Sequence, residues 1–168
     1  QERPVVITSE INHYSIESVC EHFGLGGRCI RVPVTHEGII DFEIFRQILI
    51  KCFTKRIPIA CIIFSGGNTT HCNVEKIKEG HDILYALLEK FNVNYIPYIY
   101  FDMVICWPWL FFKYYDFDKN KLDIPVAVLS KMAVILERIV FARLADGAGI
   151  DFHKGGFSPY TCSIFLSK

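Results

Sequence analysis

The sequence predicts an α/β fold, a mostly parallel β-sheet with helices on both faces. Short β-branched or apolar runs alternate with runs of helical spacing, in the order β-α-β-α-β-α-β-α-β-β. Such alternation is typical of parallel strands joined by right-handed crossover helices. The runs at 59–64 and 96–101 are apolar without alternation, as expected of strands covered on both sides. At 168 residues, the chain is long enough for one domain with a sizeable core.

The first four predicted elements are two strands and two helices. Val5–Thr8 is a short β-branched run, and Cys29–Val34 reads as a second strand. Between them, the stretch 16–23 repeats apolar side chains with helical spacing, and Gly24–Gly27 end this helix. Apolar residues recur in the same way over 41–53, which predicts the second helix.

The later elements continue the alternation. The two apolar strands named above flank a helix predicted over 74–91. Helical spacing returns over 125–143, after a charged and aromatic stretch at 113–123 that we expect on the surface. A strand leading to Phe152 and a last strand from Tyr160 complete the order.

Composition argues against several classes of partner and location. With 51% hydrophobic residues and 18 acidic against 18 basic side chains, the chain shows neither a nucleic-acid-binding patch nor a polybasic membrane patch. The apolar stretch 95–112 contains Asp102 and two prolines, which are costly inside a bilayer, so we predict no membrane span; no signal peptide is visible either. The seven cysteines form no Cys-x-x-Cys pair, which predicts buried free thiols and a cytoplasmic location.

Polar side chains follow several predicted strands at the point where each strand ends. In chain order they are His13, Asn68, Thr69, Asp102 and Lys154. Because ligands bind at the carboxyl ends of the strands in such sheets, we expect these side chains to converge at one edge.

Lys154 directly follows an apolar run and precedes two glycines, so its amine stands at the end of a strand. A neutral lysine amine attacks an aldehyde as a Schiff-base nucleophile. The buried carboxylate of Asp102 suits an aromatic aldehyde with a pyridine nitrogen, which it would keep protonated. The ring could then accept the electrons released when a bond to Cα breaks.

Further side chains at this edge fit the same kind of cofactor. His13 would stack over one face of the ring, opposite the small apolar side chain of Val104. His153 and the loop at 65–70 would donate hydrogen bonds to phosphate or substrate oxygens. Together these residues predict pyridoxal 5′-phosphate chemistry.

Four motifs, in their order and separations, resemble the group II pyridoxal-phosphate-dependent amino-acid decarboxylases, which include the aromatic-amino-acid, glutamate, histidine and tyrosine decarboxylases. Asp-Phe-His-Lys at 151–154, followed by Phe-Ser-Pro-Tyr at 157–160, resembles their cofactor-lysine motif. Residues 9–15 resemble the loop that carries their ring-stacking histidine. Residues 67–69 stand where they have Gly-Thr-Thr, and 101–104 where they have His-Val-Asp-Ala-Ala or similar.

The resemblance implies a large domain of the aspartate-aminotransferase type, fold type I of the pyridoxal-phosphate enzymes. Its sheet would have seven mainly parallel strands, and a homodimer would carry active sites at the subunit interface. The implied roles are Schiff-base lysine for Lys154, pyridinium partner for Asp102, and stacking residue and proton donor for His13. The implied cofactor contacts besides these are Asn68, Thr69, Val104 and His153. The implied reaction converts a small-molecule L-amino acid to its amine and carbon dioxide.

The chain departs from the family pattern and leaves other functions open. Asn68, Met103 and Tyr100 replace a usual threonine, alanine and histidine. Residues 1–168 resemble only the centre of the family's large domain, without the N-terminal phosphate-loop part and the C-terminal small domain. A truncated or split, non-catalytic remnant and a fold type I aminotransferase are therefore alternatives. No metal site is predicted, because His71, Cys72 and His81 fit no standard zinc spacing.

Overall fold

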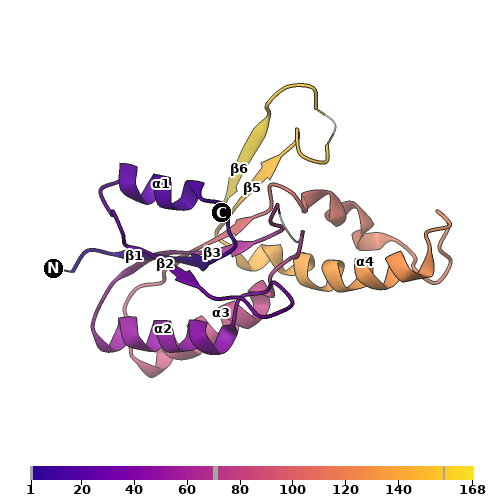
Figure 1. The fold of residues 1–168 in the computed structure, drawn as a ribbon. Helices are drawn as coiled ribbons and strands as arrows, with labels where there is room; N and C mark the ends of the chain where they lie inside the picture. Colours follow the sequence, from indigo (N-terminus) through magenta and orange to yellow (C-terminus); the bar gives the residue numbers. More distant parts are fainter. Residues whose placement is uncertain (1, 70–71, 157) are drawn as a thin grey trace.

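The computed structural model describes residues 2–69, 72–156 and 158–168, which form a six-stranded mixed sheet flanked by helices (Figure 1). Thr70, His71 and Phe157, which belong to segments discussed above, lie outside the described residues. The strands are β1 (Val5–Ser9), β2 (Cys29–Val32), β3 (Ile59–Ser65), β4 (Tyr98–Asp102), β5 (Gly147–Asp151) and β6 (Ser163–Ser167). The helices are α1 (Ser15–His22), α2 (Phe42–Thr54), α3 (Ile77–Lys90) and α4 (Val126–Ile139), with 3-10 helices η1 (Trp107–Tyr114) and η2 (Val140–Leu144).

The sheet order is β2-β1-β3-β4-β5-β6, so strands neighbour one another out of chain order at the first crossovers. The pairs from β2 through β5 are parallel, and β6 alone runs antiparallel, against β5. This arrangement confirms the predicted α/β class and the mostly parallel sheet. The described residues provide six strands, where the family resemblance implies seven for a whole domain.

Helices lie on both faces of the sheet, as predicted, but they cover the two faces unequally. Figure 1 shows α1 over one face and α2 and α3 against the other, with α4 extending beyond them. The main core lies on the α2–α3 side, where Phe45, Phe64 and Phe101 are fully buried. On α1 only Cys20 is buried, and Val19 is 52% exposed although its spacing fits an apolar stripe.

Several predicted element bounds shift by one to three residues, and three differences have local reasons. α3 begins at Ile77 rather than near Val74, because Val74 bridges to Gly66. The predicted helix over 125–143 tightens into η2 after Ile139. The stretch after β4, for which the sequence predicts no helix, contains η1, whose Trp107 packs into the core.

The cysteines are less uniformly buried than predicted. All seven are free, but Cys72 and Cys162 are exposed, so the expectation of buried thiols is wrong for these two. In the part of the chain that the structure describes, no helix is long and apolar enough to cross a membrane.

Close packing between α3 and β3 depends on Gly80. A Cβ built at this position would lie 2.3 Å from Cζ of Phe64, whose ring is fully buried. The missing side chain therefore allows the helix to approach the strand that leads into the 65–69 loop.

We predict that Gly80→Ala lowers the free energy of unfolding by about 1–3 kcal/mol. The helical preference of alanine over glycine contributes up to about 1 kcal/mol in the opposite direction, but the buried ring of Phe64 cannot move without cost. Urea denaturation measures the change, and Glu79→Ala, at the exposed neighbouring position, is the control. An equal or higher stability for Gly80→Ala would contradict the packing argument.

Candidate active site

A pocket of about 230 Å³ opens at the carboxyl ends of β1, β3, β4 and β5. It brings together six of the seven predicted site residues and leaves out His153. The twelve residues that line it are Asn12, His13, Ser15, Ser65, Gly67, Asn68, Thr69, Asp102, Val104, Ile105, Asp151 and Lys154. A larger hollow of about 690 Å³ is lined by residues of α2, α3, α4 and η2 and contains none of the predicted site residues.

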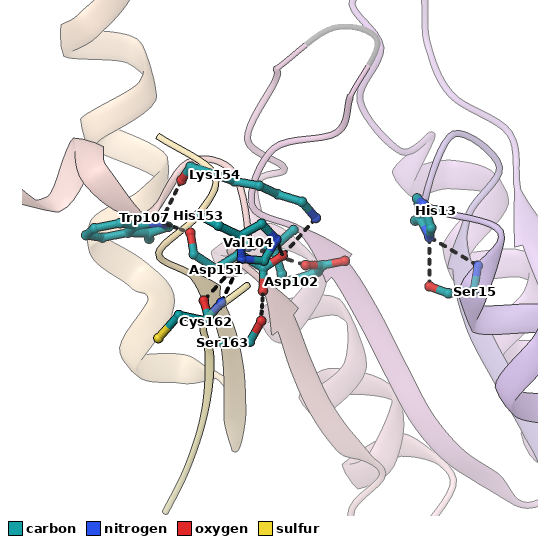
Figure 2. Close-up of polar contacts among 10 residues, drawn as sticks. All are labelled: His13, Ser15, Asp102, Val104, Trp107, Asp151, His153, Lys154, Cys162 and Ser163. Carbon is teal, nitrogen blue, oxygen red and sulfur yellow. Dashed lines mark hydrogen bonds and ion pairs between the residues drawn. The ribbon is translucent and has the colours of Figure 1, made fainter. Parts of the chain in front are cut away.

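Lys154 is held by a carboxylate that the sequence reasoning did not include among the site residues. Its Nζ lies 2.8 Å from Oδ2 of Asp151, the last residue of β5 (Figure 2). The Ser163 hydroxyl, on the antiparallel strand β6, donates to Oδ1 of Asp151 at 2.6 Å. Burial acts to raise the pKa of Asp151, but hydrogen bonds from Lys154 and Ser163 and the charge of Lys154 outweigh it and leave this pKa below its ordinary value. Asp151 is therefore an ionised counter-ion for Lys154.

The turn that carries Lys154 is fixed by a core tryptophan. The indole Nε1–H of Trp107 donates to the carbonyl oxygens of Asp151 and Lys154, at 3.0 and 3.2 Å. The Lys154 N–H in turn donates to the Asp151 carbonyl at 3.1 Å. Trp107 thus connects the buried core to the backbone on which the pocket's lysine stands (Figure 2).

Asp102 ends β4 and lines the pocket beside Lys154. Among the described residues its carboxylate accepts a long hydrogen bond, 3.4 Å, from the Val104 N–H. Burial raises the pKa of Asp102, while the Val104 N–H and the charges of Lys154 and His13 act in the opposite direction. The carboxylate therefore keeps acceptor capacity for a cationic or N–H group inside the pocket.

His13 stands on the loop between β1 and α1, across the pocket from Lys154 and Asp102 (Figure 2). Its Nδ1 lies 2.8 Å from the Ser15 hydroxyl, and its ring packs against Tyr14 with centroids 4.3 Å apart. His13 is exposed and lines the pocket, which leaves its imidazole accessible to a flat group.

The loop after β3 supplies Asn68 and Thr69 to the pocket. Its shape requires glycine at 67, where φ is 113° and a Cβ would lie 2.2 Å from Sγ of Cys106. The Asn68 carbonyl accepts from the Cys72 N–H at 3.0 Å, and Asn68 itself is buried.

His153 lies beside the pocket rather than in its lining. Its Nδ1 accepts from the Cys162 N–H at 3.2 Å, and its Nε2 is 3.6 Å from Oδ2 of Asp151. In this arrangement His153 joins the Lys154 turn to the chain that enters β6.

Glu75 is a buried carboxyl bonded to Ser65, a residue of the pocket lining, and no sequence pattern predicted a role for it. It is 1% exposed, and its Oε2 accepts from the Ser65 N–H at 2.8 Å. Burial raises its pKa from 4.5 to about 7, against the opposing effect of hydrogen bonds from Ser65, Ser9 and Ile40. It therefore connects the ends of β1 and β3, from which two of the pocket's loops emerge.

The fold is that of part of several decarboxylases of known structure. The glutamate decarboxylase domain of a diaminobutyrate-pyruvate transaminase and L-2,4-diaminobutyrate decarboxylase from Vibrio parahaemolyticus superposes with TM-score 0.67 and 14% identity, over 98% of this chain and 30% of that one. Catharanthus roseus tryptophan decarboxylase in complex with L-tryptophan gives TM-score 0.70 and 13% identity, over 97% and 30%. Oryza sativa TDC with PLP gives TM-score 0.69 and 10% identity, over 99% and 30%.

These likenesses define the fold and its extent. The chain spans about 30% of the length of the solved structures it matches. No protein-family model matches the sequence, and no curated protein matches it in a sequence comparison.

We predict that Glu75→Gln changes the pH dependence of stability. The pKa of Glu75 is about 7 in the folded chain, against an ordinary value of 4.5. Between these two pH values the folded state binds more protons than the unfolded state, so the free energy of unfolding falls as pH rises from about 4.5 to 7. The glutamine variant lacks this slope, and the stability difference between the two proteins should change by about 3 kcal/mol across that range. Urea titrations at several pH values measure it, with exposed Glu79→Gln as the control; a constant difference would contradict the assignment.

We also predict that Asp151→Asn makes Lys154 more reactive toward a small aldehyde. Loss of the 2.8 Å ion pair frees the Lys154 amine from the carboxylate that holds it, so reductive methylation of Lys154 should become about three- to tenfold faster. The surface pair Asp116–Lys119, also three residues apart and 2.9 Å long, provides the matched control. Asp116→Asn should change Lys119 labelling less than about twofold, because exposed pairs are weak. Unchanged labelling of Lys154 in Asp151→Asn would show that the pair does not control its amine.

Proposed function

We propose that the chain is the cofactor-binding core of a pyridoxal-phosphate-dependent enzyme that converts an L-amino acid to its amine and carbon dioxide. The observation that carries this proposal is the presence of Lys154, Asp102 and His13 around one pocket. The shared fold with decarboxylases, one of them holding PLP, supports it. Residues 1–168 would then form the centre of a larger cofactor-binding domain.

The side chains of the pocket fit pyridoxal phosphate. Lys154 Nζ is the amine for its aldehyde, and Asp102, with one long hydrogen bond of 3.4 Å in the described chain, is an acceptor for a pyridine N–H. His13 and Val104 would enclose the ring, and both line the pocket. Further contacts would come from Asn68, Thr69 and His153. When bound, the cofactor supplies an electron-accepting ring for the pair of electrons left at Cα when carbon dioxide departs.

The chain's own residues would orient the reactants and manage protons. Asp151 keeps the ammonium of Lys154 directed into the pocket until a ligand enters. Asp102 would hold a proton on the ring nitrogen, since its partly buried carboxylate is stronger as a partner there than in water. His13, exposed across the pocket, would place its imidazole against the ring and serve as a proton donor to the substrate.

The remaining features of the proposal concern substrate, assembly and location. The substrate is a small-molecule amino acid that enters from the carboxyl edge of the sheet. We propose a homodimer, with the pocket completed at the subunit interface, in the cytoplasm. Neither nucleic acid nor membrane is a proposed partner.

A non-catalytic remnant or split piece of such an enzyme is the second candidate, and the charge of the pocket lining favours it. Among the twelve described residues that line the pocket, Lys154 is the one lysine or arginine, and Asp151 already pairs with it. A phosphate group would therefore rely on hydroxyl, amide and backbone donors, or on residues beyond this chain.

We predict that Lys154→Ala abolishes covalent attachment of pyridoxal phosphate and leaves the fold intact. The wild-type chain, titrated with the cofactor, should develop the visible absorbance of a lysine-bound pyridoxal. Borohydride reduction and peptide mapping should then place the label on Lys154. Lys121→Ala, which removes an exposed lysine, is the control and should behave as wild type. The same chromophore in Lys154→Ala would show that another lysine carries the cofactor.

Carbon dioxide release from a panel of L-amino acids then tests the reaction. Release without an added 2-oxo acid supports decarboxylation, whereas amino transfer that requires one identifies the aminotransferase alternative. Cofactor attachment at Lys154 with neither activity supports the remnant.

A further inference from the structure

The loop that carries His13 is anchored at Asn12, whose buried side chain donates to the Thr8 hydroxyl at 2.6 Å. Helix α1, which follows it, has no side-chain hydrogen bond at its N-cap, Tyr14. The His13 imidazole bonds locally, to the Ser15 hydroxyl, and His13 is exposed. Contacts from a neighbouring strand to the backbone around His13 therefore add to the Asn12 anchor in setting where this ring stands.

Arg31, on the neighbouring strand β2, binds the loop through four contacts. Its Nη1 donates to the carbonyl oxygens of Ser9 and Asn12, at 2.9 and 2.7 Å. Its Nη2 donates to the carbonyl of His13 at 3.4 Å, and its Nε donates to Oε1 of Glu17 at 2.9 Å. One guanidinium thus joins the end of β1, the His13 backbone and the first turn of α1.

We propose that Arg31 is the positioning residue for His13, acting through the backbone of the loop at 9–13. The inference rests on the proposed function, because the position of the His13 imidazole has a role only if a cofactor binds in the pocket. The ordering of the loop by Arg31 is a property of the chain itself and can be measured without cofactor.

The contacts require arginine rather than a generic cation. A guanidinium presents five N–H donors in a rigid plane, so one group can bind carbonyls on one side and a carboxylate on the other. A lysine ammonium is a point charge on a flexible stem and cannot span Asn12 and Glu17 together. The Arg31 side chain is only 20% exposed, so water replaces its lost contacts poorly.

Arg28, the residue directly before β2, offers a matched control. It also donates to a backbone carbonyl, that of Arg3, and to a carboxylate, Glu2. Because it lies at the amino end of β2, away from the pocket, Arg28→Lys alters a similar set of bonds without touching the His13 loop.

The first experiment is amide hydrogen exchange on the chain without cofactor. In Arg31→Lys, exchange over residues 9–15 should become at least about tenfold faster, while β3 and α3 remain unchanged. Arg28→Lys should leave this segment as in wild type. Glu17→Gln, which weakens one of the four contacts, should give a smaller change in the same direction and covers the case in which Arg31→Lys folds poorly. Unchanged exchange over 9–15 in both Arg31→Lys and Glu17→Gln would overturn the proposal.

The second experiment tests whether the effect passes through His13. With pyridoxal phosphate bound, the circular dichroism band of the cofactor and the turnover rate are compared in Arg31→Lys, His13→Ala and the double variant. If Arg31 acts through His13, the double variant should be no worse than His13→Ala, although each single variant loses about tenfold. Losses that multiply would overturn the proposal. Absence of cofactor binding in wild type would count against the proposed function, whereas the exchange experiment would still decide the role of Arg31.

Discussion

Parallel pairing is the constraint on which the pocket depends. Because β1, β3, β4 and β5 run in one direction, their carboxyl ends meet at one edge of the sheet. Asp102 ends one of these strands, and Lys154 follows another within three residues. Side chains that are 141 positions apart, from His13 to Lys154, therefore line a single pocket. The antiparallel strand β6 adds to this edge from the opposite direction, through the Ser163 contact with Asp151.

Polar side chains with little exposure hold the loops that form the pocket. Glu75 connects the ends of β1 and β3, Arg31 connects β2 to the loop after β1, and Trp107 holds the turn after β5. Each group satisfies backbone atoms that would otherwise lose hydrogen bonds on burial. Polar side chains thus bond to the backbone at the carboxyl edge of the sheet, above an apolar core. These bonds determine where the loops of the pocket lie.

The sequence allowed the fold class, the element order and the pocket's main residues to be predicted, because strand patterns and residues at strand ends are local signals. It could not reveal the Lys154–Asp151 pair, since a carboxylate three residues earlier has no preferred partner until the turn folds. Glu75 lay inside a stretch of helical spacing and was assigned to a helix that in fact begins at Ile77. The exposure of Val19 was equally hidden, because spacing identifies an apolar stripe but not what covers it. His153 was expected as a cofactor contact, and its bond to Cys162 depends on where β6 returns to the sheet.

The strand order also fixes the distance between the two sides of the pocket at the level of the backbone. β1 and β5, which deliver His13 and Lys154, are separated by β3 and β4, and neighbouring strands lie about 4.8 Å apart. The strands that lead to the His13 imidazole and the Lys154 amine are thus three interstrand spacings apart. Substitutions at the strand ends can alter which chemical groups the pocket recognises. The separation of β1 from β5, in contrast, is set by the backbone hydrogen bonds that pair the strands between them.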